Sequence, residues 1–198
     1  MNNKPQTFIF FGIVGSGKGT QVELLEKYLK DNNLSDDIIT TSTGAEYRKI
    51  TSNGSYTGEI VKDRLEKGNL QPDFLTISIF INILISSLKE NTSFMSDGFP
   101  RTIAQSEAFE KAMKFYNREK IEIIYIELDK EEATRRMVLR GRSDDTEEGI
   151  AKRFDEYVNN VIPSMNYFKD KEGYNIHTID GKQSIEKVHC DIIKSLNI

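Results

Sequence analysis

Short apolar runs alternate with longer amphipathic stretches along the chain, and this alternation constrains the fold more than any other feature of the sequence. The β-prone runs are residues 8–14, 38–41, 93–96, 121–128 and 174–179. Several are apolar at nearly every position, as strands covered on both faces must be. Between them lie helical stripes, one formed by Val22, Leu25 and Leu29, another by Ile185, Val188 and Ile192. We therefore expect an α/β fold, with a five-stranded parallel sheet and helices on both faces.

The periodicity of residues 72–89 fits two kinds of element. Isoleucines at 77, 79, 81, 83 and 85 alternate with period two, as in a strand, while Phe74, Ile77, Ile81, Leu84 and Leu88 follow helical spacing. Eighteen residues are too many for an ordinary strand, and Pro72 suits the first turn of a helix. The segment is therefore predicted to be a helix.

Composition narrows the class of protein. A chain of 198 residues with a net charge of −4 is long enough for one α/β domain, residues 1–198, and lacks the basic excess of a nucleic-acid-wrapping protein. Cys190 is the sole cysteine, which excludes an intramolecular disulfide and favours a reducing compartment. The early apolar run is too short for a bilayer span and lacks a small-residue cleavage site. We expect a cytoplasmic protein that binds neither membranes nor nucleic acid.

A glycine-rich loop follows the first predicted strand and opens directly into the first amphipathic stretch. Its sequence is Gly12-Ile13-Val14-Gly15-Ser16-Gly17-Lys18-Gly19-Thr20. The glycines let successive N–H groups turn toward one centre, the helix N-terminus adds partial positive charge, and Lys18 can reach phosphate oxygens. Gly19 stands where the strict P-loop pattern has Ser or Thr. The alternative, a plain glycine turn, leaves the lysine unexplained.

The Gly-Lys-Gly-Thr variant resembles the loop of the nucleoside monophosphate kinases, and the chain as a whole most resembles the adenylate kinase family. Four ordered blocks, spanning roughly residues 8 to 183, carry the likeness: the loop, Ser42-Thr43-Gly44 with Arg48, Asp97-Gly98-Phe99-Pro100-Arg101 with Gln105, and Arg136 with Arg140-Gly141-Arg142-Ser143-Asp144-Asp145 and Arg153. The resemblance implies a P-loop NTPase-type sheet interrupted by two mobile parts. These are an acceptor-binding segment at 42–71 and a short lid at 139–145.

Phosphoryl transfer between nucleotides requires positioning and neutralisation of charge more than covalent help from the protein. An acceptor phosphate is already a nucleophile near neutral pH, so the obstacle is repulsion between two anions. Arginines relieve it, since a guanidinium binds phosphate oxygens bidentately and keeps its charge. With Lys18, the resemblance marks as catalytic Arg101, Arg136, Arg140, Arg142 and Arg153. Arg135, in the same run, is expected to be a solvated surface charge.

By the same resemblance the remaining site residues divide between two nucleotides. ATP would be held by Gly15, Ser16, Gly17, Lys18, Gly19, Thr20, Arg136, Arg140 and Gln183. AMP would be held by Thr43, Arg48, Asn69, Leu70, Gln71, Gly98, Phe99, Pro100, Arg101, Gln105, Arg142 and Arg153. Mg²⁺ would arrive on ATP, with its waters held by Asp97 and Thr20 and with no direct protein ligand. Asp144 and Asp145 are expected to pair with arginines as the lid closes.

The resemblance implies a reversible phosphotransferase that makes two ADP from Mg-ATP and AMP, acting as a monomer. The short lid has no cysteine or histidine and leaves no room for zinc. Val14, Ser96 and Gln71 depart from the usual Pro, apolar and Val residues of the family, and Gln71 lies near the base. A UMP/CMP kinase is the nearest alternative, although Thr43 and Gln105 favour adenine. A P-loop switch, an interaction module or a non-catalytic homologue would leave the arginines unexplained.

Overall fold

The computed structural model describes residues 5–35, 37–141 and 146–198 and contains one sheet of five parallel strands. The strands are β1 (Thr7–Gly12), β2 (Ile38–Ser42), β3 (Ser93–Asp97), β4 (Ile121–Glu127) and β5 (Tyr174–Asp180), and their order in the sheet is β2-β3-β1-β4-β5. Each strand coincides with one predicted apolar run to within two residues at either end. The predicted fold class is confirmed.

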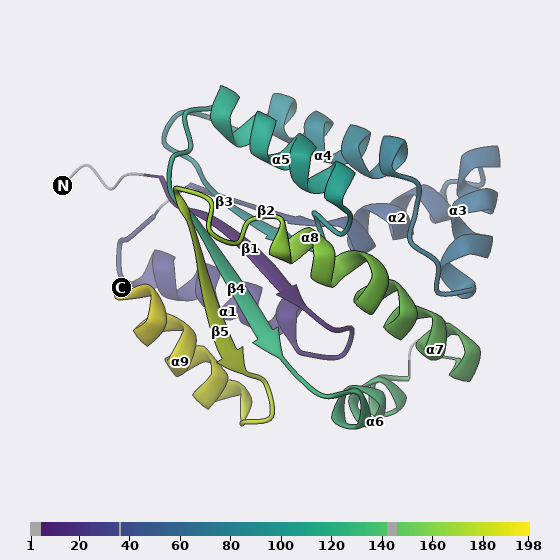
Figure 1. Ribbon diagram of the computed structural model, residues 1–198. Coiled ribbons are helices and arrows are strands. Elements are labelled where there is room, and N and C mark those ends of the chain that lie inside the picture. The colour runs from purple at the N-terminus through teal and green to yellow at the C-terminus, as the bar shows by residue number, and fades with distance from the viewer. Residues whose placement is uncertain (1–4, 36, 142–145) are drawn as a thin grey trace.

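Helices cover both faces of the sheet (Figure 1). On one face lie α1 (Lys18–Asp31) and α9 (Ile185–Leu196); on the other lie α4 (Asp73–Ser87), α5 (Ile103–Phe115) and α8 (Ile162–Asn166). The chain leaves β1 toward the first face and the neighbouring strand β3 toward the second. Adjacent strands with connections on opposite faces form a crevice at their carboxyl ends, where α/β proteins bind ligands.

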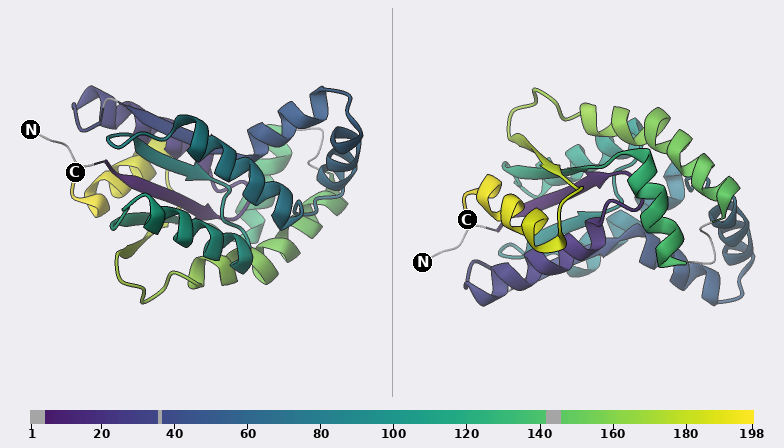
Figure 2. Two further views of the ribbon diagram at one scale, coloured as in Figure 1. Left: turned by 90° about the horizontal axis from the view of Figure 1, so that it is seen from above. Right: turned by 90° about the horizontal axis from the view of Figure 1, so that it is seen from below.

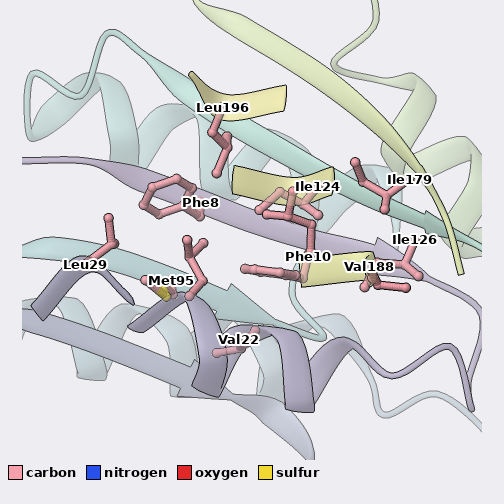
Figure 3. Packing of buried hydrophobic residues seen from close by; sticks show 12 residues of the cluster. Phe8, Phe10, Val22, Leu29, Met95, Ile124, Ile126, Ile179, Val188 and Leu196 are labelled. Atoms are coloured by element: carbon pink, nitrogen blue, oxygen red, sulfur yellow. The ribbon is translucent and has the colours of Figure 1, made fainter. Parts of the chain in front are cut away.

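Amphipathic helices bury the expected stripes on the α1/α9 face. Val22, Leu25 and Leu29 belong to one buried cluster with apolar side chains of β1 and with Met95 of β3. Figure 3 shows Val22 and Leu29 beside Met95. The α9 stripe is shifted from the prediction: Val188 and Ile192 are buried, but Ile185 is 53% exposed. Ile185 is the first residue of α9, and the buried stripe continues forward, at four-residue spacing, to Leu196.

The segment with two possible periodicities is the helix α4, as predicted. Pro72 lies immediately before its first residue rather than within the first turn, and its carbonyl accepts from the N–H groups of Leu75 and Thr76. Its buried residues recur at every fourth position, namely Thr76, Phe80 and Leu84. Aromatic packing fixes this face, since the Phe80 ring stacks on Phe99 with centroids 4.2 Å apart. Tertiary packing therefore selects the helical pattern over the period-two pattern.

Polar side chains define where several helices begin. In each case an oxygen at the residue before the helix accepts a hydrogen bond from a backbone N–H two or three residues into it, which satisfies a donor that the helix cannot pair. These caps are Ser55, Thr102, Asp129, Thr146 and Ser184.

The remaining helices lie beyond the carboxyl ends of the strands. They are α2 (Thr43–Ser52), α3 (Tyr56–Glu66), α6 (Lys130–Arg140) and α7 (Glu147–Glu156), and a π-helical turn, Tyr157–Val161, joins α7 to α8. Figure 2 shows α2 and α3 at the end of the molecule away from the C-terminus. In the described part of the chain, no helix is long and apolar enough to span a membrane.

Candidate active site

A cavity of about 560 Å³ opens at the carboxyl ends of the strands. Its cations come from six separate parts of the chain: the glycine loop, α2, α3, the turn after β3, the end of α6, and α7. In that order they are Lys18, Arg48, Lys62, Arg101, Arg140 and Arg153. Such a density of positive charge around one hollow suits a ligand carrying several phosphates.

The loop before α1 borders this cavity, which Gly12, Val14 and Lys18 line. Gly15 has a φ of +88°, and a Cβ there would lie 2.8 Å from the Ala133 carbonyl oxygen, so only glycine fits. A hydrogen bond from the Ser16 N–H to the Ile13 carbonyl closes the turn that contains Gly15, and Gly17 immediately precedes α1. The helix starts at Lys18, with Gly19 and Thr20 in its first turn, so unpaired helical N–H groups lie beside the loop.

Lys18 lies against its own loop. Its Nζ donates to the carbonyl oxygens of Gly12 and Ile13 at 2.8 and 3.0 Å. Burial lowers the pKa of Lys18 to about 8; the charge of Asp97 opposes this shift, and Arg101 and Arg140 add to it. The ammonium is therefore poised to gain an anionic partner. Asp97 supplies a carboxylate at the end of β3.

The turn after β3 holds Arg101 in place. Its Nε donates to the Gly98 carbonyl, and its backbone N–H donates to Oε1 of Gln105, both at 2.9 Å. Gly98 has a φ of +82°, and a Cβ there would lie 2.6 Å from Nη2 of Arg101 and 2.7 Å from Oγ1 of Thr43. Glycine thus lets a predicted acceptor-binding threonine and arginine approach the same backbone. Burial lowers the pKa of Arg101.

A smaller pocket of about 60 Å³ adjoins the cavity. The predicted acceptor residues that line it are Thr43, Asn69, Leu70, Gln71, Gly98, Arg101 and Gln105. Thr43 donates to the Gly98 carbonyl at 2.9 Å, and Nε2 of Gln105 donates to Oδ1 of Asp73 at 2.8 Å. Polar groups held this firmly can read the edge of a base.

Residues 10–173 match the adenylate kinase family model. This chain belongs to the adenylate kinase family. It is 33% identical over 194 residues to the adenylate kinase of Bacteroides thetaiotaomicron, covering 96% of this chain and 97% of that one. It is also 33% identical over 184 residues to the adenylate kinase of Prochlorococcus marinus, covering 93% and 94%, and 34% identical over 194 residues to that of Bacteroides fragilis, covering 96% and 97%.

Among the described residues that the family resemblance assigned to ATP or AMP, eight line neither pocket of this adenylate kinase. Five belong to the loop and the first turn of α1 around Lys18, namely Gly15, Ser16, Gly17, Gly19 and Thr20. The other three are Arg136, Phe99 and Gln183. Arg136 donates to Oε1 of Glu132 and to the Gly181 carbonyl. Phe99 is buried in the core between Pro100 and Gly98, which do line the cavity. Gln183 lies in the turn before α9, and its side chain donates to the Asp180 carbonyl and to Asp191.

Other sequence expectations concern α6 and the residues that follow it. Arg135 is exposed and bonded to Glu132, as expected for a surface charge. Arg142, Asp144 and Asp145 lie outside the described residues.

Two tyrosines were not predicted to belong to the site. Tyr47 lines the small pocket and its hydroxyl lies 2.5 Å from that of Thr76. Tyr157 lines the large cavity, and burial raises the pKa of its hydroxyl, which lies 2.9 Å from the Tyr125 hydroxyl. Helical spacing could have identified both tyrosines. Tyr47 lies four residues after Thr43, and Tyr157 lies four residues after Arg153, so each falls on the same helix face as a predicted site residue.

The carboxylates near the loop suit a metal that is bound mainly by a nucleotide. Within residues 5–35, 37–141 and 146–198, no three His, Cys, Asp or Glu side chains come together as a metal cage. Asp97 is a single carboxylate beside the loop, and Mg²⁺ usually keeps several waters while binding substrate phosphates and one or two carboxylates. Asp97, whose Oδ2 lies beside Gly19 of the loop, fits that type of site.

Proposed function

We propose that this adenylate kinase transfers the γ-phosphoryl group of Mg-ATP directly to the phosphate of AMP, reversibly, giving two ADP. The observation that carries the proposal is the convergence of Lys18 and four arginines from separate elements on one cavity. One triphosphate could be held by a P-loop alone. A second set of cations, on α2 and on the turn after β3, provides for a second phosphate-bearing nucleotide.

The proposed division of labour follows the elements. Loop N–H groups, Lys18 and Arg140 bind the phosphates of ATP, while Arg48 and Arg101 bind the phosphate of AMP. Arg153, together with Arg142, neutralises the charge of the group in transfer. Arg136, whose guanidinium is bonded to Glu132 in this structure, would join the donor site only by exchanging that partner. The AMP phosphate is itself the nucleophile, so no side chain has to remove a proton.

Mg²⁺, bound to ATP, would be held through its waters by Asp97 and Thr20. It supplies neutralisation of charge on the nucleotide phosphates. The chain contributes the orientation: Lys18 and the loop fix the donor, and the bonded turn of Gly98 and Arg101 fixes the acceptor.

We also propose that residues 42–71 and 139–145 close over the two nucleotides. Closure would exclude water, which competes with AMP for the phosphoryl group. The remaining proposals are that the protein acts as a monomer in the cytoplasm, on free nucleotides. The exposed thiol of Cys190 suits a reducing compartment.

AMP is the proposed acceptor because Thr43 and Gln105 line the base pocket with fixed polar groups. Initial rates of ADP formation from ATP, measured with AMP, CMP, UMP and GMP in turn, test this choice. We expect the highest kcat/KM with AMP. A higher kcat/KM with CMP or UMP would assign the chain to the pyrimidine nucleotide kinases, and transfer to none of the four would refute the kinase assignment.

A further inference from the structure

The side chain of Gln71 is buried in the small acceptor pocket. Gln71 lies between α3 and α4, immediately before Pro72, and is 5% exposed. It lines the pocket together with Thr43 and Gln105. A buried amide is costly unless its donor and acceptor are both paired, so its hydrogen bonds indicate what the pocket is built to receive.

Only one end of this amide is paired. Nε2 of Gln71 donates to the Val61 carbonyl of α3 at 3.4 Å, whereas Oε1 has no hydrogen-bond partner among the described residues. Within that part of the chain, Oε1 is the only buried side-chain nitrogen or oxygen lining this pocket that lacks a partner. Gln105, by contrast, uses both ends of its amide, on the Arg101 N–H and on Asp73.

The Val61 carbonyl also fixes which end of the Gln71 amide is available. Rotating the amide by 180° would place Oε1 against the carbonyl oxygen of Val61, bringing two acceptors together. The pocket therefore offers an unpaired acceptor, held in one orientation by the backbone of α3.

We propose that Oε1 of Gln71 accepts a hydrogen bond from the exocyclic 6-amino group of the acceptor base, which makes Gln71 a specificity-determining residue. This inference rests on the proposed function. It adds one contact, between the side chain of Gln71 and the acceptor base. Adenine carries an amino donor at position 6. Hypoxanthine carries an oxygen there, which would meet Oε1 as a second acceptor, and unsubstituted purine carries only hydrogen. Sites with a buried polar group reject ligands that leave the group unpaired.

Removing the amide from the protein and the amino group from the ligand tests the contact. The acceptors are AMP, IMP and purine riboside 5′-monophosphate, and the proteins are the wild type and Gln71→Met, which keeps the length of the side chain without its polar atoms. We expect the wild type to prefer AMP to purine riboside 5′-monophosphate by about 10-fold or more in kcat/KM. In Gln71→Met the preference should fall below about 3-fold, through KM for the acceptor, while KM for ATP stays within about 2-fold.

Gln21→Met is the matched control. Gln21 is 2% exposed, its Nε2 donates to the Ile185 carbonyl at 2.9 Å, and its Oε1 is likewise unpaired among the described residues. It packs toward α9 and away from the acceptor pocket, so its substitution should leave the ratio of AMP to purine riboside 5′-monophosphate unchanged. If both variants lowered the ratio equally, the effect of Gln71 would be a general loss of packing.

The outcomes separate this inference from the function on which it rests. If the wild type phosphorylates AMP but treats purine riboside 5′-monophosphate equally well, the contact does not exist. An AMP preference that survives in Gln71→Met overturns the role of Gln71 while leaving the kinase assignment intact. Should Gln71→Met fail to fold, judged by circular dichroism, Gln71→Val replaces it, and calorimetric binding of the two nucleotides to the wild type measures the same preference without any variant.

Discussion

The Tyr125 hydroxyl lies 2.9 Å from the Tyr157 hydroxyl, and this hydrogen bond ties β4 to the π-helical turn that follows α7. Tyr157 also lines the large cavity, one helical turn after Arg153. The pair therefore links β4 to the helix that presents a proposed catalytic arginine. π-Helical turns of this kind are frequent at functional sites.

Tyr125→Phe should lower the free energy of unfolding by about 1 kcal/mol, the typical net value of one intramolecular hydrogen bond. Tyr157→Phe should cost a similar amount. Because each hydroxyl is the partner of the other, the double variant should cost less than the sum of the two single variants. Urea denaturation measures all three; strictly additive costs would mean that the hydroxyls do not interact.

Lys18→Ala removes the side-chain cation of the glycine loop. We expect turnover to fall by at least about 100-fold, since electrostatic stabilisation by one donor at a transferring group has that order of magnitude. Among the described residues the side chain donates hydrogen bonds only to its own loop, so circular dichroism should report an intact fold. If the variant kept most of its turnover, the assignment of the glycine loop to the ATP-binding site would be wrong.

The lowered pKa of Lys18 predicts how activity depends on pH. Burial holds this pKa at about 8, below the ordinary lysine value, so the free enzyme loses the ammonium proton as pH rises through about 8. Since kcat/KM reports ionisations of the free enzyme, kcat/KM for ATP should fall above pH 8. ATP phosphates favour the charged form and raise the pKa, so kcat should fall only at higher pH. Equal pH profiles for kcat and kcat/KM would contradict this.

Gln105→Ala should weaken the acceptor more than the donor. The side chain of Gln105 lines the base pocket, and its Oε1 accepts a hydrogen bond from the Arg101 backbone N–H. The substitution should therefore weaken recognition of the base and also displace the arginine that binds the AMP phosphate. We expect KM for AMP to rise about 10-fold or more and KM for ATP to change by less than about 3-fold. Steady-state kinetics with each substrate varied in turn measures both; a larger effect on ATP would place Gln105 in the donor site.

Arg153→Ala should depress kcat strongly, because its proposed contact strengthens as charge develops on the group in transfer. Arg135→Ala is the matched control, an exposed arginine on α6 bonded to Glu132, and should leave kcat within about 2-fold. A two-headed inhibitor, two adenosines joined by about five phosphates, should bind Arg153→Ala more weakly by roughly 1.5–3 kcal/mol for one charge-assisted contact. If calorimetry gave the same inhibitor affinity for Arg153→Ala and Arg135→Ala, Arg153 would be a surface charge with no contact to the phosphates.

Most of the fold was predictable from the sequence because burial on both faces leaves a strong mark on parallel strands. Residues 121–128, for example, are apolar at every position except Glu122 and Glu127. The glycine loop before Lys18 marks the junction of β1 and α1. Ile185 was misplaced because the first residue of a helix can satisfy the stripe pattern without reaching the sheet. Residue spacing identifies the apolar stripe of a helix. The position of the helix over the sheet decides which residues of that stripe are buried.

The site was predictable as a set of residue types but not as a set of contacts. The family resemblance marked both Arg136 and Arg140 as site residues. In the structure Arg136 donates a hydrogen bond to Glu132, whereas Arg140 lines the cavity. Which of two arginines on one helix reaches a cavity depends on local ion pairs. The unpaired oxygen of Gln71 likewise depends on the position of the Val61 carbonyl, which lies in a different helix.

Direct transfer between two nucleotides in one cavity is tested most directly by following the phosphoryl group itself. ATP labelled in its γ-phosphoryl group with ³²P is mixed with AMP and a stoichiometric amount of protein, and the products are separated after a single turnover. We predict that the label appears in the β-phosphoryl group of ADP, with none on the protein and little as inorganic phosphate. Label on the protein, or release mainly as inorganic phosphate, would contradict direct transfer from ATP to AMP.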